Sequence, residues 1–306
     1  MSKLITKNGL TVRALASQLL LLDVGMRIPR VEDYSKQLEV GRGTVQTAMG
    51  FLQESGAIKL AACGHLGTVL MASDKKKLWT MAGLSNILGT MPLPYTKSYE
   101  GLATALCEVF AAADVPFGMT YQRGSLARIA AVKDKRSDFA VCSRLSAEYA
   151  VAGDDEITIA ASLPPKTYVG EHAVIFRPGC GSQIVDGMSI AIDPSSIDQR
   201  LMTDMVSAGR KVLLVESPYN QTADMLRTGA VDAVVWNADE FEDKFIQLGC
   251  TLQRLDSREA STSTAATLVC RKSDGHLNTI IRDVVKSDKI IEIQAQVIRN
   301  EKLPRY

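Results

Sequence analysis

The sequence lacks a long hydrophobic run, and this absence argues against a membrane-spanning protein. No stretch approaches the roughly 18 consecutive apolar residues that a membrane helix needs, and the run at residues 19–22 is far too short. The first ten residues also lack the apolar core and the small-residue cleavage site of a secretory signal peptide. We therefore expect a cytoplasmic protein that does not associate with a membrane.

Cysteine and histidine are scarce and scattered. The six cysteines include no CxxC pair, and the three histidines stand far apart in the chain. This spacing does not match a zinc site, so reduced and mostly buried thiols are the better interpretation. We expect no metal and no cofactor.

Charge is distributed unevenly along a chain whose formal net charge is only +1. The first 78 residues contain 11 basic and 6 acidic residues, whereas the remainder contains 24 basic and 28 acidic residues. Such asymmetry suits a small N-terminal domain that faces a polyanion and a larger domain that does not.

The N-terminal part has the pattern of a winged helix. Apolar residues recur at three and four between residues 12 and 20, a break follows at Gly25 and Pro29, and residues 31–38 form a short second helix. A turn leads into a third helix at 42–55, which ends before Gly56, and two short strands follow at 57–60 and 68–71. The order helix, helix, turn, helix, hairpin predicts a winged helix-turn-helix domain over residues 1–73.

A second domain follows a predicted linker over residues 74–92, in which residues 78–88 form a helix that Pro92 ends. From residue 93 to 306, short apolar strands alternate with helices in two blocks, which predicts an α/β domain with two lobes. The predicted strands are residues 117–120, 139–142, 189–192, 212–215 and 233–236. The predicted helices are residues 101–113, 126–132, 197–208 and 221–227, and two extended segments lie at 171–176 and 264–270.

The winged-helix segment resembles the GntR family of bacterial regulators. The matching landmarks are the helix start Arg42-Gly43-Thr44-Val45, the turn Leu52-Gln53-Glu54-Ser55-Gly56-Ala57-Ile58 and the wing Gly64-His65-Leu66-Gly67-Thr68. Gly41 and Arg30 depart from the family, which usually has serine at both positions. The resemblance implies a double-stranded DNA operator as partner and a homodimer that reads a two-fold site.

Individual DNA contacts follow from the chemistry of these positions. Arg42 at the start of the recognition helix suits a bidentate contact to guanine, and Thr44 suits a phosphate or a thymine methyl group. Gln46 is a further candidate for a base contact. The wing glycines Gly64 and Gly67 let the backbone approach phosphates, His65 suits the minor groove, and the resemblance places Arg30 at a phosphate. A winged helix that serves protein contacts instead is the alternative.

The large domain resembles type II periplasmic-binding-protein-like domains, the fold also used by LysR-type effector domains. The whole chain resembles the YhfZ family of regulators, which combines these two parts. In such a fold the ligand lies between the lobes, where strands end and helices begin, and free N–H groups at helix starts favour an anion. The effector is therefore expected to be a small carboxylate- or phosphate-bearing metabolite.

Candidate ligand residues lie in the loops that follow the predicted strands. They are Ser98, Tyr99, Glu100, Gly124, Ser125, Ser143, Ser195, Ser196, Tyr219, Asn220 and Trp236. Other roles are open for several of them, because Ser125, Ser195 and Ser196 also suit helix capping and Trp236 also suits a core.

Together these features predict a DNA-binding transcriptional regulator that responds to a small metabolite. An enzyme, or a ligand-binding protein that does not bind DNA, remains the alternative because the two-lobed fold also serves such proteins. The sequence has no Gly-x-Ser-x-Gly elbow, P-loop or His-Glu-x-x-His motif, and a nucleophilic Cys180 would need a histidine nearby. We therefore expect no catalytic activity.

Overall fold

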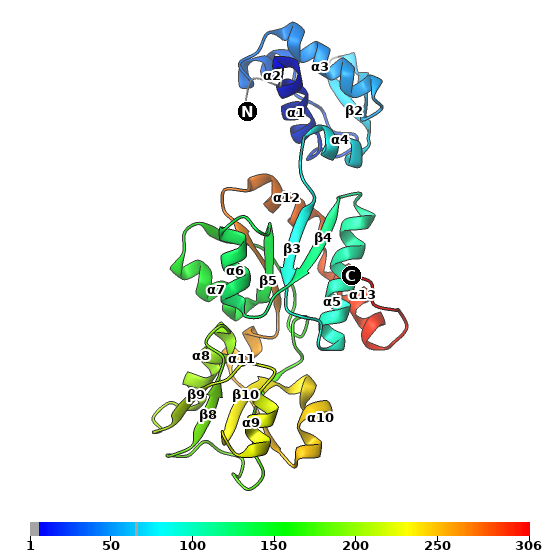
Figure 1. The fold of residues 1–306 in the computed structure, drawn as a ribbon. Coiled ribbons are helices and arrows are strands. Elements are labelled where there is room, and N and C mark those ends of the chain that lie inside the picture. The colour runs from blue at the N-terminus through cyan, green and yellow to red at the C-terminus, as the bar shows by residue number, and fades with distance from the viewer. Residues whose placement is uncertain (1–5, 65–66) are drawn as a thin grey trace. The chain divides into compact units, whose positions relative to one another are not determined.

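The computed structural model describes residues 6–64 and 67–306, which fall into two compact units (Figure 1). The first unit comprises the chain up to residue 87 together with 110–117, and the second comprises 88–109 together with 118–306. None of the helices in the described part of the chain combines the length and the apolar character that a membrane-spanning segment needs.

The first unit is a helix-turn-helix followed by a hairpin and one more helix. Its elements are α1 (Lys7–Leu19), α2 (Val31–Gln37), α3 (Arg42–Glu54), β1 (Ile58–Ala62), β2 (Thr68–Ser73) and α4 (Lys75–Met81). The predicted helices and hairpin are present, with β1 and β2 antiparallel and a register irregularity between Lys59 and Leu60. Leu15 of α1, Val45 of α3 and Leu70 of β2 are fully buried, so the apolar stripes of the helices meet over one face of the hairpin.

The predicted linker helix at 78–88 is wrong in its second half. The helix α4 ends at Met81, Gly83 follows with a φ of +64°, and residues 87–91 form strand β3 (Ile87–Met91). A left-handed conformation one residue beyond the cap ends a helix, and glycine is the residue that adopts it without strain. The helix also belongs to the first unit, since Arg13 of α1 donates to the carbonyl groups of Ala82 and Gly83.

The second unit contains two five-stranded sheets, each the centre of one lobe (Figure 1). Lobe A has the strand order β4-β3-β5-β12-β6 and lobe B the order β11-β7-β10-β8-β9. In each sheet, parallel pairs (β3 with β5, β10 with β8, β8 with β9) are joined to antiparallel neighbours. The chain passes from lobe A to lobe B after β6 and returns after β11, so two connections join the lobes.

The elements of lobe A come from both ends of the unit. They are β3, α5 (Lys97–Ala112), β4 (Phe117–Tyr121), α6 (Ser125–Lys133), β5 (Phe139–Ser143), α7 (Arg144–Gly153), β6 (Ile157–Ser162), β12 (Ala266–Arg271), α12 (Gly275–Val284) and α13 (Ser287–Ile298). The elements of lobe B are β7 (His172–Phe176), β8 (Ser189–Ile192), α8 (Ile197–Val206), β9 (Leu213–Glu216), α9 (Thr222–Thr228), β10 (Ala233–Asn237), α10 (Phe241–Lys244), β11 (Thr251–Arg254) and α11 (Arg258–Thr262), with short 3-10 turns η2 (Ala238–Glu240) and η3 (Ile246–Leu248).

Helix α8 lies between the lobes and packs on both of them. Its first residue, Ile197, is fully buried in a cluster with Ile129, Cys142 and Val269 of lobe A. Farther along the same helix, Met202 is buried with Val174 and the other core residues of lobe B. This helix therefore fixes how the two sheets face each other.

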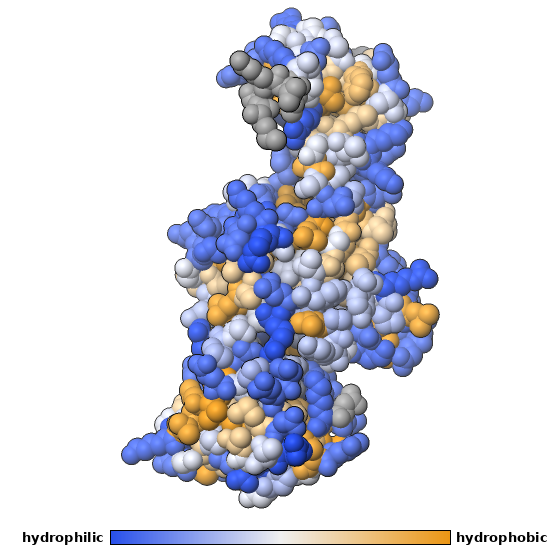
Figure 2. All heavy atoms as spheres, in the orientation of Figure 1, coloured by the Kyte–Doolittle hydropathy of each residue, from blue (hydrophilic) through white to orange (hydrophobic). Residues whose placement is uncertain are grey.

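Hydrophobic side chains on the outside of the molecule are scattered. On the face drawn in Figure 2, most of the surface is hydrophilic or intermediate, and orange groups are small and separate. Leu213 and Leu214 lie exposed on β9, at one edge of the lobe B sheet.

Candidate functional site

The recognition helix α3 presents its first turn to solvent. Arg42 and Gln46 are exposed, Thr44 is half-buried, and Val45 and Ala48 on the opposite face belong to the core. The Arg42 guanidinium lies 3.1 Å from the Glu32 carboxylate. The side chains of Arg42 and Glu32 are 68% and 50% exposed, respectively, so the pair lies in solvent. An exposed pair of this kind contributes little to stability, so Arg42 can exchange Glu32 for a nucleic-acid partner at small cost.

The other predicted DNA contacts flank this helix. Arg30 is exposed and precedes α2, where its backbone N–H donates to the Asp33 carboxylate at 3.0 Å. Gly64 and Gly67 lie in the loop between β1 and β2 with φ values of +55° and +83°. The loop is tight, since the Cys63 N–H donates to the Gly67 carbonyl at 2.8 Å. His65 lies outside the described residues.

Arg27 was not predicted and lies at the wing. It pairs with Val69 across an isolated β-bridge, and a Cβ atom added to Gly67 would lie only 2.7 Å from Arg27 Nε. The wing glycine therefore leaves room for an exposed guanidinium beside the backbone of the loop. No local sequence pattern signals this contact, because the bridge joins residues more than forty positions apart.

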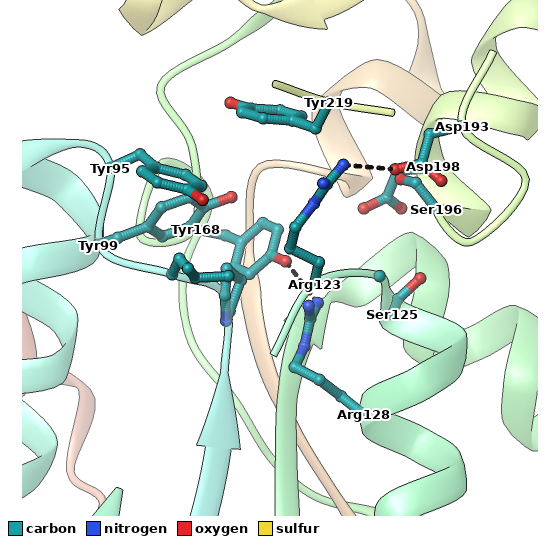
Figure 3. Close-up of a pocket in the computed structure, with 13 residues that line it drawn as sticks. Tyr95, Tyr99, Arg123, Ser125, Arg128, Tyr168, Asp193, Ser196, Asp198 and Tyr219 are labelled. Carbon is teal, nitrogen blue, oxygen red and sulfur yellow. Dashed lines mark hydrogen bonds and ion pairs between the residues drawn. The ribbon is translucent and has the colours of Figure 1, made fainter. Parts of the chain in front are cut away.

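The second unit contains a cleft whose outer cavity has a volume of about 110 Å³ (Figure 3). Residues from both lobes line it: Pro92, Leu93, Tyr95, Tyr99, Arg123, Gly124, Ser125, Arg128, Tyr168, Asp193, Ser196, Asp198 and Tyr219. The cavity lies where β3, β4 and β8 end and where α6 and α8 begin. This is the edge at which the fold predicts a ligand site.

An inner cavity of about 100 Å³ adjoins the outer one, since six residues line both. It is lined by Tyr99, Tyr168, Val169, His172, Asp193, Ser196, Asp198, Gln199, Met202, Tyr219, Val235, Trp236 and Asn237. The lining is aromatic and polar, with His172, Trp236 and Asn237 supplied by the neighbouring strands β7 and β10.

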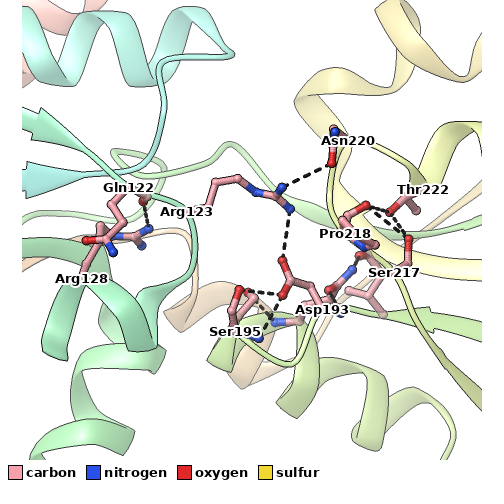
Figure 4. A network of polar contacts seen from close by, with 12 residues as sticks. Gln122, Arg123, Arg128, Asp193, Ser195, Ser217, Pro218, Asn220 and Thr222 are labelled. Atoms are coloured by element: carbon pink, nitrogen blue, oxygen red, sulfur yellow. Dashed lines mark hydrogen bonds and ion pairs between the residues drawn. The ribbon is translucent and has the colours of Figure 1, made fainter. Parts of the chain in front are cut away.

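Two arginines of lobe A reach the cleft in different ways (Figure 4). Arg128 is 3% exposed and donates to the carbonyl groups of Val141 and Gln122 and to the Tyr168 hydroxyl, at 2.9–3.0 Å. Arg123 is more exposed and crosses to lobe B, where it meets Asn220 at 3.3 Å and Asp193 at 3.6 Å. Arg128 is thus rigidly held, whereas Arg123 makes longer contacts across the opening.

Asp198 at the start of α8 is the second buried charge of the cleft. Its Oδ1 accepts hydrogen bonds from the hydroxyl groups of Ser143 and Ser146, both at the start of α7. These contacts between the start of α7 in lobe A and the start of α8 in lobe B form the joint between the lobes. Ser125 of lobe A belongs to the same joint, because its hydroxyl accepts from the Ile197 backbone N–H at 3.1 Å. Burial raises the pKa of the Asp198 carboxyl, while the two serine hydrogen bonds and Arg128 oppose this shift.

Aromatic rings from both lobes close one side of the cleft. Tyr219 stacks between Tyr95, at a ring-centroid distance of 5.8 Å, and Trp236, at 4.0 Å. The Tyr219 hydroxyl donates to Glu240, which also pairs with Lys244. Because Tyr95 belongs to lobe A and the others to lobe B, the stack spans the opening between the lobes.

His172 lies in the wall of the inner cavity as a neutral imidazole. The Ser263 hydroxyl donates to the Ala260 carbonyl at 2.7 Å, so at 2.9 Å from His172 it acts as the acceptor and Nδ1 carries the proton. The other ring nitrogen, Nε2, is then a hydrogen-bond acceptor. Burial lowers the pKa of His172 to about 4.

This histidine makes the stability of the second unit depend on pH. Because its folded pKa of about 4 lies below the ordinary value of 6.5, the unfolded chain binds more protons as the pH falls below 6.5. The free energy of unfolding should decrease by about 1–2 kcal/mol between pH 6.5 and 5 on this account. Urea unfolding at both pH values measures it, with the exposed His276→Gln variant as control. A His172→Gln variant with an unchanged pH dependence would contradict the assignment.

The predicted ligand residues divide into two groups in the structure. Those that line a cavity are Tyr99, Gly124, Ser125, Ser196, Tyr219 and Trp236. Those that line neither are Ser98, Glu100, Ser143, Ser195 and Asn220. Ser196 does cap α8, accepting from the Gln199 N–H, so for this residue both interpretations describe the structure.

The residues placed outside the cavities have structural partners. Ser98 and Glu100 lie in the first turn of α5, not in a loop, and there the Ser98 carbonyl accepts from Gln294 while Glu100 pairs with Lys97. Ser143 caps α7. Ser195 and Asn220 lie at the rim, bonded to Asp193 and Arg123 respectively.

Arg128 and Asp198, the two buried charged residues of the cleft, were not predicted from the sequence. Each sits inside a predicted helix, three residues after Ser125 in one case and two after Ser196 in the other, where a charged side chain normally faces water. Cys180, by contrast, lies beside Asp232 at 3.5 Å, and burial raises the pKa of its thiol. A raised pKa disfavours the thiolate, which is the nucleophilic form of cysteine.

Comparison with known proteins defines the two parts. Residues 23–70 match the family described as "Helix-turn-helix domain", and residues 74–306 match the family described as "YhfZ C-terminal domain".

The second unit also has the fold of two periplasmic domains that share little sequence with it. The VFT2 domain of Bordetella pertussis BvgS has a TM-score of 0.51 at 15% identity, covering 72% of this chain and 97% of that one. The aliphatic sulphonate binding protein SsuA from Escherichia coli has a TM-score of 0.53 at 14% identity, covering 70% and 74%.

The chain is therefore a helix-turn-helix protein with a two-lobed domain of the periplasmic-binding-protein-like fold. The sequence is 32% identical to YhfZ of Escherichia coli (strain K12) over 303 residues, which is 99% of this chain and 98% of that protein. A crystal structure of YhfZ from Shigella flexneri matches with a TM-score of 0.65 at 33% identity, covering 76% of this chain and 97% of that one. The chain belongs to the YhfZ family.

Proposed function

We propose that this protein is a transcriptional regulator that binds operator DNA through α3 and the wing, and whose cleft binds a small carboxylate-bearing effector. The observation that carries the proposal is the pairing, in one chain, of an exposed recognition helix with a two-lobed cleft that holds a buried arginine. The recognition helix offers Arg42, Thr44 and Gln46, and its start and its wing resemble those of GntR-family regulators. The cleft offers Arg128, a guanidinium fork that matches the geometry of a carboxylate.

The charge of the first unit supports the DNA-binding half of this proposal. Arg27, Arg30 and Arg42 are all exposed, and they lie beside the wing, just before α2 and at the start of α3. Cations at these places suit a duplex whose phosphates flank the groove that the recognition helix enters. We expect the protein to act in the cytoplasm as a homodimer, because paired domains read two-fold operators. The mass of the complex with a single operator would then account for two chains.

The cleft is proposed as a binding site for an effector, not as a catalytic site. Its polar groups are held by one another and by backbone groups in the pattern of a preformed site for a small ligand. A ligand that binds one arrangement of the lobes more tightly would shift the protein toward that arrangement. The resulting change in DNA affinity cannot exceed the difference between the ligand's affinities for the two arrangements. The effector is therefore expected to alter the midpoint of operator binding.

Arg42→Ala tests the recognition helix. Loss of a bidentate base contact should weaken operator binding by about 1–3 kcal/mol. The operator can be isolated by selecting genomic fragments on the full-length protein, and affinities are then compared by gel shift at one fixed salt concentration.

Lys76→Ala is the matched control, because Lys76 is an exposed cation on α4 and belongs neither to the first turn of α3 nor to the wing. It should leave the affinity nearly unchanged. Equal affinities of wild type and Arg42→Ala for the selected fragment would overturn the assignment of α3.

A further inference from the structure

The two cavities of the cleft contain two buried charges of opposite sign that have no ion-pair partner. Four charged residues line the cavities, and two of them, Arg123 and Asp193, pair with each other. Arg128 and Asp198 are 3% and 7% exposed, and their hydrogen bonds go to carbonyl and hydroxyl groups. Within the described chain, neither forms an ion pair.

Arg128 and Asp198 attract each other without forming an ion pair, so each buried group still lacks a counter-charge in contact and favours a ligand that brings one. Three of the five guanidinium hydrogens of Arg128 are used by its hydrogen bonds, and two remain for a carboxylate. On Asp198, both serine hydroxyl groups bond to Oδ1, which leaves Oδ2 for a cation. A ligand with a single negative group would satisfy Arg128 and add repulsion at Asp198.

The inner cavity adds a second, independent requirement. The Trp236 indole Nε1 and the Asn237 amide Nδ2 are buried, and neither has a hydrogen-bond partner among the described residues. Their residues are 3% and 9% exposed and line this cavity. Buried donors without a partner are rare in native structures, so a ligand group with acceptor atoms is expected here. The acceptor His172 Nε2 can receive one hydrogen bond in return.

The space limits the ligand to a small molecule. The two cavities measure about 110 and 100 Å³, whereas an engineered cavity of about 150 Å³ accommodates benzene. Together they accommodate roughly eight to ten non-hydrogen atoms on this scale. A small amino acid is therefore of the right size to fill the two cavities.

We propose that the cleft binds a small polar α-amino acid as a zwitterion, with its carboxylate at Arg128, its ammonium group at Asp198 and its side chain in the inner cavity. This inference rests on the proposed effector site and specifies the ligand class. The rings of Tyr99, Tyr168 and Tyr219 line the same two cavities as Asp198, and aromatic faces favour a cation. The polar side chain would accept hydrogen bonds from Trp236 and Asn237.

Calorimetry on the full-length protein tests the ligand class without any substitution. The titrants are asparagine, glutamine, serine and threonine in both enantiomers, together with inorganic phosphate and three comparison compounds. Succinamate lacks the ammonium group of asparagine, asparaginamide lacks its carboxylate, and valine is the apolar isostere of threonine. At least one polar amino acid should bind, at least tenfold more tightly than its analogue that lacks one of these groups.

The outcomes separate cleanly. Equal binding of succinamate or of inorganic phosphate would show an anion site and overturn the zwitterion inference while leaving an effector site in place. Absence of binding by every amino acid tested would also overturn it. Operator binding by the same protein is measured separately by gel shift, so failure of the ligand inference and failure of the regulator proposal give different results.

Asp198→Asn provides the matched test of position. The asparagine Oδ1 still accepts from Ser143 and Ser146, so the joint between the lobes is retained while the charge is lost. We expect at least a tenfold loss of affinity for the amino acid and no comparable loss in Asp224→Asn, whose exposed carboxylate pairs with Arg227 on α9. If Asp198→Asn is folded, as judged by its unfolding transition, and binds the amino acid unchanged, the assignment of the ammonium position is wrong.

Discussion

Ile197→Ala should lower the free energy of unfolding of the second unit by about 3 kcal/mol, because it empties a buried site at the joint between the lobes. The Ile197 side chain belongs to lobe B by its helix, yet it is fully buried among Ile129, Cys142 and Val269 of lobe A. Removing three carbon atoms there creates a cavity that the two sheets cannot close without moving toward each other.

The experiment is urea unfolding followed by tryptophan fluorescence in a Trp79→Phe background, which leaves Trp236 of lobe B as the only indole. Ile291→Ala serves as the control, since this α13 side chain is 39% exposed and its truncation should change stability by about 0.5 kcal/mol or less. A loss at Ile197 no larger than the loss at Ile291 would show that α8 does not couple the lobes.

The first unit was largely predictable because its signals are local. Helix periodicity, the glycine after α3 and the hairpin all act within a few residues, and the structure places α2, α3 and the strands within a few positions of the predicted ranges. The prediction of the linker helix was wrong because it, too, relied on local signals alone. Apolar residues continue through Leu88, but Gly83 ends the helix and residues 87–91 join a sheet whose other strands lie far away in sequence.

Most strands of the second unit were predicted, and the extended segments at 171–176 and 264–270 correspond to β7 and β12, but β3, β6, β11 and the C-terminal helices were not predicted. The predicted strand at 189–192 matches β8, and the four others agree with β4, β5, β9 and β10 to within one or two residues. Nothing was assigned after residue 270, although α12 and α13 follow there. Helix α13 is fixed by tertiary packing, since Gln294 donates to the carbonyl groups of Ser98 and Thr167.

The loops predicted to hold the site do border the two cavities of the cleft, but the buried charged residues that line these cavities were not predicted. Loops after parallel strands predict the edge of the sheet where a site forms, and this rule does not say which side chains turn inward. Arg128 and Asp198 point into the cleft because partners distant in sequence, such as Tyr168 and Ser143, hold them there. Such contacts leave no trace in local periodicity. Several predicted hydroxyl groups are instead occupied in the joint, with Ser125 and Ser143 bonded to α8.

The lobes also approach each other closely at Gly124, where a substitution is expected to have the second large effect on stability. This residue has φ +77° and ψ 128°, a conformation that costs other residues about 1–3 kcal/mol. A Cβ atom at this position would lie 2.9 Å from the Ser195 carbonyl oxygen and 2.8 Å from the Ser195 Cβ, so lobe B approaches lobe A here backbone to backbone. Crowding of this kind adds about 1–3 kcal/mol.

Gly124→Ala is therefore expected to lower the free energy of unfolding by about 3 kcal/mol, and to weaken ligand binding because the lobes cannot approach as closely. Urea unfolding and calorimetry measure the two effects. Gly153→Ala is the control, since no atom lies within 4 Å of its added Cβ and the residue ends α7. If both variants unfold at the same urea concentration as the wild type, the lobes do not need this approach, and the cleft would have to close by another contact, such as the stack of Tyr95 on Tyr219.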